Sequence, residues 1–577
     1  MSVKKIKDPI YGYIEIDNEL VSKVIDTAVF QRLRNVRQTS YASLYPSSLS
    51  NRFVHSLGVY HLGKIVSEAI YNSVTFHKKK STSLLNTLYN LFSKEEWERY
   101  RLLFEWACLL HDVGHAPFSH TGEEFYIGSK SEADIEICDD EISYMTSAEI
   151  SEMKEYTYQK HLKQLTGDIA FLNAKSPAPH EIMSAIVGIS CFGGLFTNNE
   201  EKSFFSRCIT GLTYAEADKL SHEDYNNMDQ VKHREIKKKS LLNCFIKALH
   251  STVIDVDRLD YIIRDAITMG YQSVSIDYKR LLQGVVIILE DDFNFTLGFH
   301  ESAISIIENA VYAHDNEKKW VQGHPSILYE GYLIQQSIIE INEKLKTDFS
   351  NTPASLFSYD SLTEQGSRFG DMNVRLLGDE DILHFMKNVY PCKCSEEYFN
   401  RASRRLPVWK SESEYMYLFG SHEQEIISKA IKKMVGEEDA AKRGFVINQE
   451  SLRVFKEGIN EALEYGLENK AKNLRYKMKC FDAILSICRD FKIKEDILFL
   501  ATNFFKSNFS KGDIRNLQIL FSKTGSSRPL KEVSSPLLST PPSHGRFIYL
   551  YYYPRDNGER INAKDFANAI EKALSEL

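Results

Sequence analysis

The chain has 577 residues, of which 43% are hydrophobic and 26% are charged, and its formal net charge is −8. This composition excludes a chain that is disordered over most of its length, because disorder needs few hydrophobic residues and a high net charge. It also argues against a protein that works mainly by non-specific nucleic-acid binding, since such proteins are usually basic.

No stretch reaches the roughly 18 apolar residues that span a bilayer, and the start of the sequence lacks the apolar segment of a signal peptide. The nine cysteines are scattered and odd in number, which does not suit a disulfide framework. Cys392 and Cys394 are the one close pair, but they are too close for a CxxC motif. We therefore expect a cytoplasmic protein with reduced thiols and no membrane segment.

The first part of the chain is dense in helical patterning. Apolar residues recur at three- and four-residue spacing over 19–37, 55–74 and 98–114, as they do on the buried face of a helix. The acidic, polar stretch 129–160 is typical of a surface insertion. A β-branched run, an Asp-Asp turn and an alternating segment predict a β-hairpin over 284–299.

Helical patterning continues over 301–347, and the pattern changes beyond about residue 376. Further helical segments are predicted over 380–437 and 450–522, with a strand at 444–447. These segments predict an accessory, mainly helical region.

The end of the chain is different in composition. Ser and Pro are frequent in 523–545, which is typical of a loop or linker. An aromatic strand at 547–553 and a helix at 563–576 then predict a short strand–helix unit. The sequence as a whole predicts a mainly α-helical fold with a small β-hairpin, an accessory helical region and a C-terminal βα unit.

The strongest local signal for chemistry is Leu109-Leu110-His111-Asp112-Val113-Gly114-His115. An apolar helix runs into a His-Asp pair and ends at Gly114, with Pro117 just beyond. At the end of a helix both side chains can bend toward one point, and imidazole with carboxylate suits Mg, Mn, Fe or Zn. The alternative is a pair of core or capping residues.

Two other segments carry polar residues at helical spacing. Arg52 and His55 lie three residues apart and share a helix face. The segment 255–265 has a polar face about 135° from its apolar stripe, and this face suits metal, phosphate and sugar, although an ordinary solvated face is the alternative. The polar face holds Asp257, Arg258, Tyr261 and Asp265.

His55, His111-Asp112 and Asp257 form an H…HD…D pattern, and with it the sequence resembles the HD-domain metal-dependent phosphohydrolases. Among them it is most similar to the deoxynucleoside triphosphate (dNTP) triphosphohydrolases, which include the human enzyme with a SAM and an HD domain. The likeness keeps its order over roughly residues 1–330. The matching segments are Asp8–Gly12, Phe30–Arg34, Asn51–Val59, His111–His120, Asp255–Tyr261 and Asp277–Arg280.

The resemblance implies a role for each matching residue. The implied metal ligands are His55, His111, Asp112 and Asp257. His115 is the implied catalytic histidine, Glu123 the acidic partner that orients it, and His180 a further active-site histidine. The implied phosphate and sugar contacts are Gln38, Arg52, Arg258, Tyr261 and Asp265.

The implied reaction is hydrolysis of a dNTP to deoxynucleoside and inorganic triphosphate. A divalent ion (Fe, Mn, Mg or Zn) would be the cofactor, with Mg accompanying the substrate triphosphate. Arg52 and Arg258 would neutralise the polyphosphate, and His115 would protonate the leaving 5′-oxygen or assist the nucleophile. The alternative is an HD phosphohydrolase acting on another nucleotide (an NTP or nucleoside monophosphate), or a nuclease on single-stranded nucleic acid.

The sequence departs from the family beside the sugar, where Gln38 is followed by Thr39 instead of Leu and 40–43 lacks the usual glycines. This departure leaves the preference for deoxyribose open. Family members often form dimers or tetramers with nucleotide between subunits, and Asp26 and Arg34 lie in the corresponding segment. We therefore expect a homo-oligomer, without assigning a regulatory nucleotide.

The loosely matching helix near His324 ends the likeness, and residues beyond about 376 resemble no family that we can identify. The expected domains are an HD phosphohydrolase domain at 1–375, an accessory mainly helical region at 376–522, a Ser/Pro-rich loop or linker at 523–545 and a strand–helix unit at 546–577.

Overall fold

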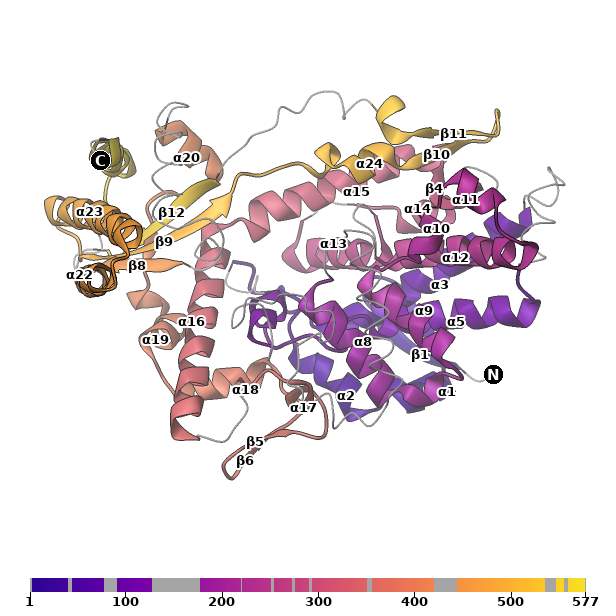
Figure 1. Ribbon diagram of the computed structural model, residues 1–577, viewed down its shortest axis with the longest axis horizontal. Helices are drawn as coiled ribbons and strands as arrows, with labels where there is room; N and C mark the ends of the chain where they lie inside the picture. Colours follow the sequence, from indigo (N-terminus) through magenta and orange to yellow (C-terminus); the bar gives the residue numbers. More distant parts are fainter. Residues whose placement is uncertain are drawn as a thin grey trace. The chain divides into compact units, whose positions relative to one another are not determined.

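The structure is a computed structural model (Figure 1). It describes residues 3–39, 44–76, 91–126, 177–218, 220–250, 254–271, 275–289, 293–349, 355–419, 444–534, 546–554 and 559–575. The expected insertion at 129–160 and the second half of the expected linker lie outside these residues. The mainly α-helical fold with small sheets is confirmed.

The chain forms two compact units. The first is made of Met1–Asp315, Ile339–Tyr390 and Ser507–Thr540, and the second of Asn316–Ile338, Pro391–Lys506 and Pro541–Leu577. This division crosses the boundary expected at 375, because residues before it join the second unit and residues well after it return to the first. That the domains expected from the sequence fold independently stays a prediction.

Long helices form the centre of the first unit. α3 packs against α5 and α13, and α9 packs against α5 and α12 (Figure 1). A capping box starts α5: the Ser93 hydroxyl accepts from the Glu96 amide at 3.1 Å, and the Glu96 carboxylate accepts from the Ser93 amide at 2.7 Å. The helices are α3 (Arg52–Phe76), α5 (Lys94–Leu110), α9 (Asn199–Thr210), α12 (Gln230–Leu249) and α13 (Val256–Met269).

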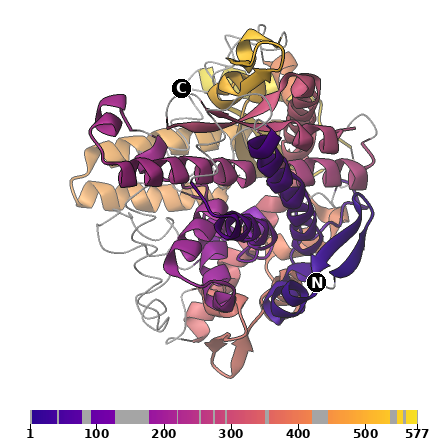
Figure 2. The ribbon, with the colours of Figure 1, turned by 90° about the vertical axis from the view of Figure 1, so that its right-hand side faces the viewer.

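The N-terminal segment differs from its prediction. β1 (Val3–Asp8) and β2 (Gly12–Asp17) form an antiparallel hairpin beside the N-terminus (Figure 2), which the sequence had not suggested. The single helix expected over 19–37 is broken into short turns, because Thr27 caps a new helix that starts at Ala28, its hydroxyl accepting from the Phe30 amide. The turns are α1 (Asn18–Leu20), a π-turn (Val21–Ile25), α2 (Ala28–Gln31) and a 3₁₀-turn (Arg32–Asn35).

The β-hairpin expected near 284–299 is confirmed as β3 (Val285–Leu289) and β4 (Phe295–His300). It belongs to a four-stranded sheet of order β11-β10-β4-β3. β10 (Gln518–Phe521) lies in the segment 450–522 that was expected to be helical, and β11 (Ser526–Pro529) lies in the expected loop or linker. The helical prediction is wrong here, because the free edge of β4 pairs with β10 in parallel.

Shorter elements complete the first unit. They are α8 (Pro179–Cys191), α10 (Ala215–Asp218), α11 (His222–Asn226), α14 (Tyr278–Gln283), α15 (Ile304–Glu317), α17 (Tyr359–Leu362), β5 (Ser367–Phe369), β6 (Met372–Val374), α18 (Asp379–His384) and α24 (Gly512–Asn516). α16 (Pro325–Asp348) has residues in both units, and so has α15, whose last two residues belong to the second unit.

The second unit has a sheet of order β7-β12-β9-β8. Its strands are β7 (Leu406–Pro407), β8 (Phe445–Asn448), β9 (Asp496–Asn503) and β12 (Arg546–Tyr552), and its helices are α19 (Lys393–Phe399), α20 (Glu412–Leu418), α22 (Gln449–Glu464), α23 (Glu468–Asp490) and α25 (Ala563–Ser575). The strands expected at 444–447 and 547–553 and the last helix are confirmed. β9 lies in the segment 450–522 that was predicted to be helical, and that prediction is wrong there, because a continuous apolar run fits a strand as well as a helix. Among the described helices, none combines the length and apolarity needed to cross a bilayer.

Candidate active site

Four side chains from α3, α13 and the end of α5 converge in the first unit. His55 lies in the first turn of α3, His111 caps the end of α5 with Asp112 following, and Asp257 lies in the first turn of α13. His55 Nε2 is 3.0 Å from Asp257 Oδ1, 3.3 Å from His111 Nε2 and 3.5 Å from Asp112 Oδ2. The four residues expected to be metal ligands are therefore brought together.

The second ring nitrogens show that this group fits a metal ion. His111 Nδ1 lies 2.9 Å from the Cys108 carbonyl oxygen, and His55 Nδ1 lies 2.7 Å from Asp260 Oδ2. Because a carbonyl or carboxylate oxygen can only accept, each Nδ1 is a donor, and each Nε2 is the atom that would bind a metal ion once it has lost its proton. Two such imidazoles and two carboxylates are a suitable donor set for a divalent cation.

The charges at this site point the same way. Burial disfavours the imidazolium form of His55, but hydrogen bonds to Asp257 and Asp260 outweigh burial and raise its pKa to about 9. For Asp112, burial raises the pKa, but Arg52 and His111 outweigh it and hold the pKa at about 2. The site therefore favours a positive charge among these groups, and a metal ion would supply it in place of a proton.

Asp260 is a functional residue that the sequence reasoning missed. It is completely buried, and its carboxylate accepts from Tyr11 Oη at 2.7 Å and from Arg264 Nε at 2.9 Å as well as from His55. A Cβ at Gly58 would lie 1.9 Å from Asp260 Oδ1, so only glycine lets α3 approach so closely. Its spacing of three from Asp257, which puts both on one helix face, could have revealed it.

Asp260→Asn is expected to weaken metal binding about 10- to 100-fold, because such outer carboxylates orient the ligating imidazole. It should also lower the free energy of unfolding by about 3 kcal/mol, since Arg264 loses a buried charged partner. Metal titration and chemical denaturation measure the two effects. Tyr11→Phe is the control, because it removes one hydrogen bond to Asp260 and keeps the charge; equal metal affinity in Asp260→Asn and wild type would contradict the role.

Arg52 joins the ligands to the neighbouring loops. Its Nη1 donates to Asp112 Oδ2 at 2.7 Å, its Nε to Ser119 Oγ at 2.9 Å and its Nη2 to the Gln38 carbonyl at 3.3 Å. Arg52 and Asp112 are both buried. Arg52, the expected phosphate contact, is thus a cation held in a fixed position beside the four candidate metal ligands.

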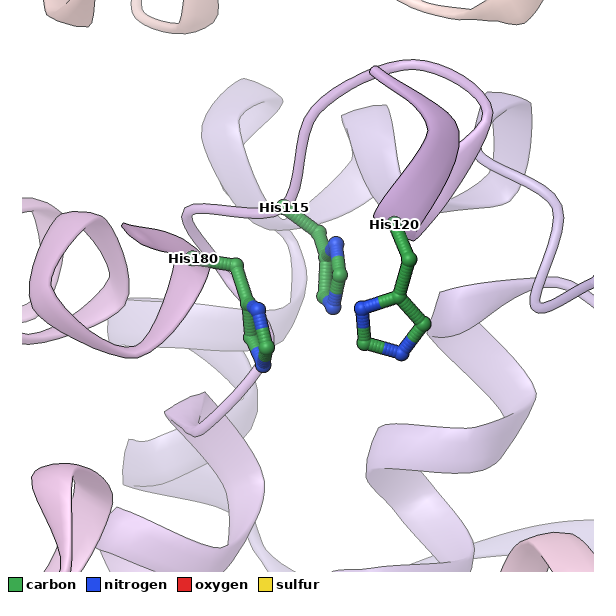
Figure 3. A group of neighbouring side chains, drawn as sticks. All are labelled: His115, His120 and His180. Carbon is green, nitrogen blue, oxygen red and sulfur yellow. The ribbon is translucent and has the colours of Figure 1, made fainter. Parts of the chain in front are cut away.

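Three histidines gather beside the ligands (Figure 3). The rings of His115 and His180 are stacked, with centroids 4.2 Å apart and planes at 16°, and His120 meets both edge-on. His115 is completely buried, and neither of its nitrogens has a hydrogen-bond partner within the described parts of the chain. Because the lone pairs of stacked rings run nearly parallel, His115 and His180 do not aim at one ion, and the cluster suits proton transfer or anion binding better than a metal.

Glu123 contacts different histidines from the one expected. Its Oε2 is hydrogen-bonded to His180 Nδ1, and its Oε1 lies 3.0 Å from His120 Nδ1. It makes no hydrogen bond to His115, so the expected direct orientation of His115 by Glu123 is not seen. The short 3₁₀-turns at Ser119–Thr121 and Glu123–Phe125 instead carry Glu123 to the N-terminal end of α8, where His180 lies.

The environments of the two stacked histidines push their pKa values apart. Burial, with Arg52 nearby, holds the pKa of His115 well below its ordinary value. His180 is also buried, but its hydrogen bond to Glu123 outweighs burial and raises its pKa. His120 was not assigned from the sequence. Two consecutive left-handed residues, Phe118 (φ 57°) and Ser119 (φ 52°), precede it, so no helical or strand spacing predicts its place.

The other expected substrate contacts lie on α13 and before α3. Arg258 Nη1, Gln38 Oε1 and both carboxylate oxygens of Asp265 are buried without a hydrogen-bond partner in the part of the chain that is described. Buried polar atoms are normally paired, so these atoms are available to a ligand. Tyr261 differs, since its hydroxyl lies 3.1 Å from His314 Nε2 on α15, a histidine that the sequence gave no role.

Asp265→Asn is expected to raise the melting temperature at neutral and alkaline pH. Burial raises the pKa of Asp265 from 3.8 to about 7, so the wild type loses stability as the pH rises from about 4 to about 7, and the amide does not titrate. The gain should therefore be larger at pH 8 than at pH 5, while substrate affinity falls. Melting curves at both pH values test this. Asp482→Asn, at an exposed carboxylate on α23, is the control, and an equal gain at both pH values would refute the prediction.

Comparison with known proteins agrees with this geometry. The family model of the HD domain matches residues 52–164. An uncharacterized protein of Mycoplasma genitalium is 24% identical over 52% of this chain and 52% of its own length. The deoxynucleoside triphosphate triphosphohydrolase SAMHD1 of Bos taurus is 30% identical over 49% of this chain and 38% of its own length. That of Homo sapiens is 37% identical over 21% of this chain and 16% of its own length.

The matches thus span about half of the first relative and little more than a third of the bovine enzyme. The match with the HD-domain model includes the candidate ligands His55, His111 and Asp112. The resemblance seen in the sequence is confirmed: the HD-domain model matches residues 52–164, and the chain is similar to relatives named as dNTP triphosphohydrolases.

Proposed function

We propose that the protein hydrolyses dNTPs to deoxynucleoside and inorganic triphosphate with the help of a divalent metal ion. The observation that supports this most is the convergence of His55, His111, Asp112 and Asp257 beside the three clustered histidines and Arg52. Relatives whose names state this reaction, the bovine and human dNTP triphosphohydrolases, support the choice of substrate.

In the proposed reaction a water oxygen attacks the α-phosphorus, the bond from that phosphorus to O5′ breaks, and O5′ takes up a proton. A divalent ion held by the four ligands would polarise a phosphoryl oxygen as a Lewis acid. Arg52, held in place by Asp112 and Ser119, would neutralise charge on the triphosphate. Arg258 would add a second cation through its unpaired Nη1.

His180 is the better candidate for giving the proton to O5′. Its hydrogen bond to Glu123 favours the protonated ring, whereas nothing comparable favours it at His115. His115, which is stacked on His180 and has no hydrogen-bond partner among the described residues, would then contact the phosphate or assist the water. The sequence predicted His115 as the catalytic histidine; the proposal gives proton donation to His180 and keeps both residues in the site.

Asp265 and Gln38 are proposed to bind the sugar. A carboxylate repels phosphate but accepts a hydrogen bond from a hydroxyl group, and both residues have unpaired buried oxygens. This assignment makes the sugar hydroxyls, rather than the base, the first determinant of specificity. Whether a ribose is also accepted depends on the neighbouring segment, where the sequence departs from its family.

The deciding assay incubates purified protein with each dNTP and NTP and with Mn, Mg or Fe, and identifies the products. Inorganic triphosphate from dNTPs is the expected result. Monophosphate or orthophosphate products, or cleavage of single-stranded nucleic acid alone, would replace the proposal by the alternative HD phosphohydrolase or nuclease. Metal analysis of the purified protein identifies the ion. Light scattering with and without nucleotide tests the proposed homo-oligomer.

A further inference from the structure

A segment beyond the expected HD domain reaches the active-site loops of the same unit. Asp379, the first residue of α18, is buried, and its carboxylate accepts two backbone hydrogen bonds. Oδ1 accepts from the Phe118 amide at 2.7 Å, and Oδ2 accepts from the Arg37 amide at 3.1 Å. One side chain therefore links the loop that carries His120 with the segment that carries Gln38.

The residues before Asp379 hold the segment in place. Arg32 is buried and donates from Nη1 to the Leu377 carbonyl at 2.9 Å, and from Nη2 to the carbonyls of Val113 and His115 at 2.8 and 2.9 Å. A Cβ at Gly378 would lie 2.9 Å from Asn35 Cβ, so glycine allows the close approach of the two backbones. The segment 377–379 is thus fixed to the same loop at two places.

The loop that Asp379 holds is strained. Phe118 and Ser119 both have a left-handed backbone conformation. Residues other than glycine rarely adopt it, and it persists only where surrounding contacts impose it. Ser119 Oγ donates to the Arg37 carbonyl at 2.5 Å and accepts from Arg52 Nε. The two hydrogen bonds of Asp379 close this set of contacts around Arg37, Phe118 and Ser119.

We propose that Asp379 is a positioning residue of the active site, which holds the left-handed turn at Phe118–Ser119 and thereby places His120 and Arg52 against the substrate. The proposal rests on the proposed function in taking this site to be the catalytic one. A carboxylate is needed because both of its oxygens accept, whereas an amide offers one acceptor and turns a donor toward the second N–H. Burial raises the pKa of Asp379 to about 6, against the effect of its two backbone hydrogen bonds, so an ionised group is retained at a cost to stability.

Asp379→Asn tests this, with Asp381→Asn as the matched control. Asp381 is exposed on the same helix and, among the described residues, accepts only from the Gly378 amide at 2.8 Å, so its variant loses a charge, keeps an acceptor for that amide and leaves the loop untouched. In Asp379→Asn we expect kcat to fall about 100-fold on the substrate that the wild type cleaves, with KM and bound metal little changed. Hydrogen exchange of the peptide covering 113–121 should become faster in this variant alone.

The exchange measurement keeps the two proposals distinguishable. If the wild type cleaves no dNTP but another substrate, the proposed function fails while kcat and exchange still judge Asp379. Unchanged exchange at 113–121 in Asp379→Asn would overturn the inference. So would a fall in kcat that Asp381→Asn matches, or one that merely follows the folded fraction seen by circular dichroism. Asp379→Glu, which restores two acceptors, should recover part of kcat.

Discussion

Replacing Asp257 with Ala is expected to abolish metal-dependent turnover, with a loss of at least about 1,000-fold in kcat. Asp257 Oδ1 lies 3.0 Å from His55 Nε2 and 3.5 Å from His111 Nε2. Metal ions contribute several kcal/mol of transition-state stabilisation, and each 1.36 kcal/mol corresponds to tenfold in rate. Without Asp257, the remaining carboxylate, Asp112, is already shared with Arg52.

The measurement combines metal analysis with product analysis over a range of metal concentrations. Ile267→Ala, at an exposed position on the same helix, is the control and should keep full activity. Excess metal should restore little of the activity, because the Nε2 atoms of His55 and His111 lose the carboxylate oxygen that lies 3.0 and 3.5 Å from them. Turnover near the wild-type level in Asp257→Ala would mean that the metal site lies elsewhere.

The ligand group could be predicted from the sequence because it depends on residue types at ordered positions in helices. The helix over 98–114 ends where the His-Asp pair was expected, and the spacing of Arg52 and His55 put both on one helix face. The structure adds what spacing cannot show, namely the distances between segments far apart in the chain. Asp260 illustrates this, since its role depends on the approach of α3 at Gly58.

Other parts of the fold could not be predicted, for identifiable physical reasons. β10 pairs with β4, whose residues lie more than two hundred positions earlier, and local patterning contains nothing about such a partner. His120 and Glu123 follow left-handed backbone, so neither period of secondary structure applies to them. Asp379 lies beyond the part of the sequence, roughly residues 1–330, that resembles the family. Its function depends on two backbone amides, which have no sequence signature.

The second large effect is expected at His180. If this ring gives the proton to O5′, His180→Ala should lower kcat about 100- to 10,000-fold, the range that general acid catalysis contributes. Glu123→Gln should act on the same step without removing the acid. Although His180 is buried, its hydrogen bond to Glu123 raises its pKa, so the neutral amide should lower that pKa. Turnover of this variant should then begin to fall at a lower pH than turnover of the wild type.

The pH profile of kcat separates this role from a structural one. A misfolded site would lower kcat at every pH, whereas loss of the Glu123 charge should shift the alkaline limb and leave more activity at pH 6 than at pH 8. The stability of the fold should also depend on pH. Because the pKa of His180 is raised in the folded state, the protonated ring stabilises the fold below about pH 6.5, and this contribution is lost as the pH rises through the folded-state pKa. Glu123→Gln should thus lower the melting temperature more at pH 6 than at pH 9. His233→Ala is the control, because His233 lies outside the site, with its Nε2 2.6 Å from the Tyr225 carbonyl oxygen. This variant should change neither pH profile. An unshifted limb in Glu123→Gln would assign the proton to His115 instead, because His120 and His180 are both hydrogen-bonded to Glu123 and His115 is not.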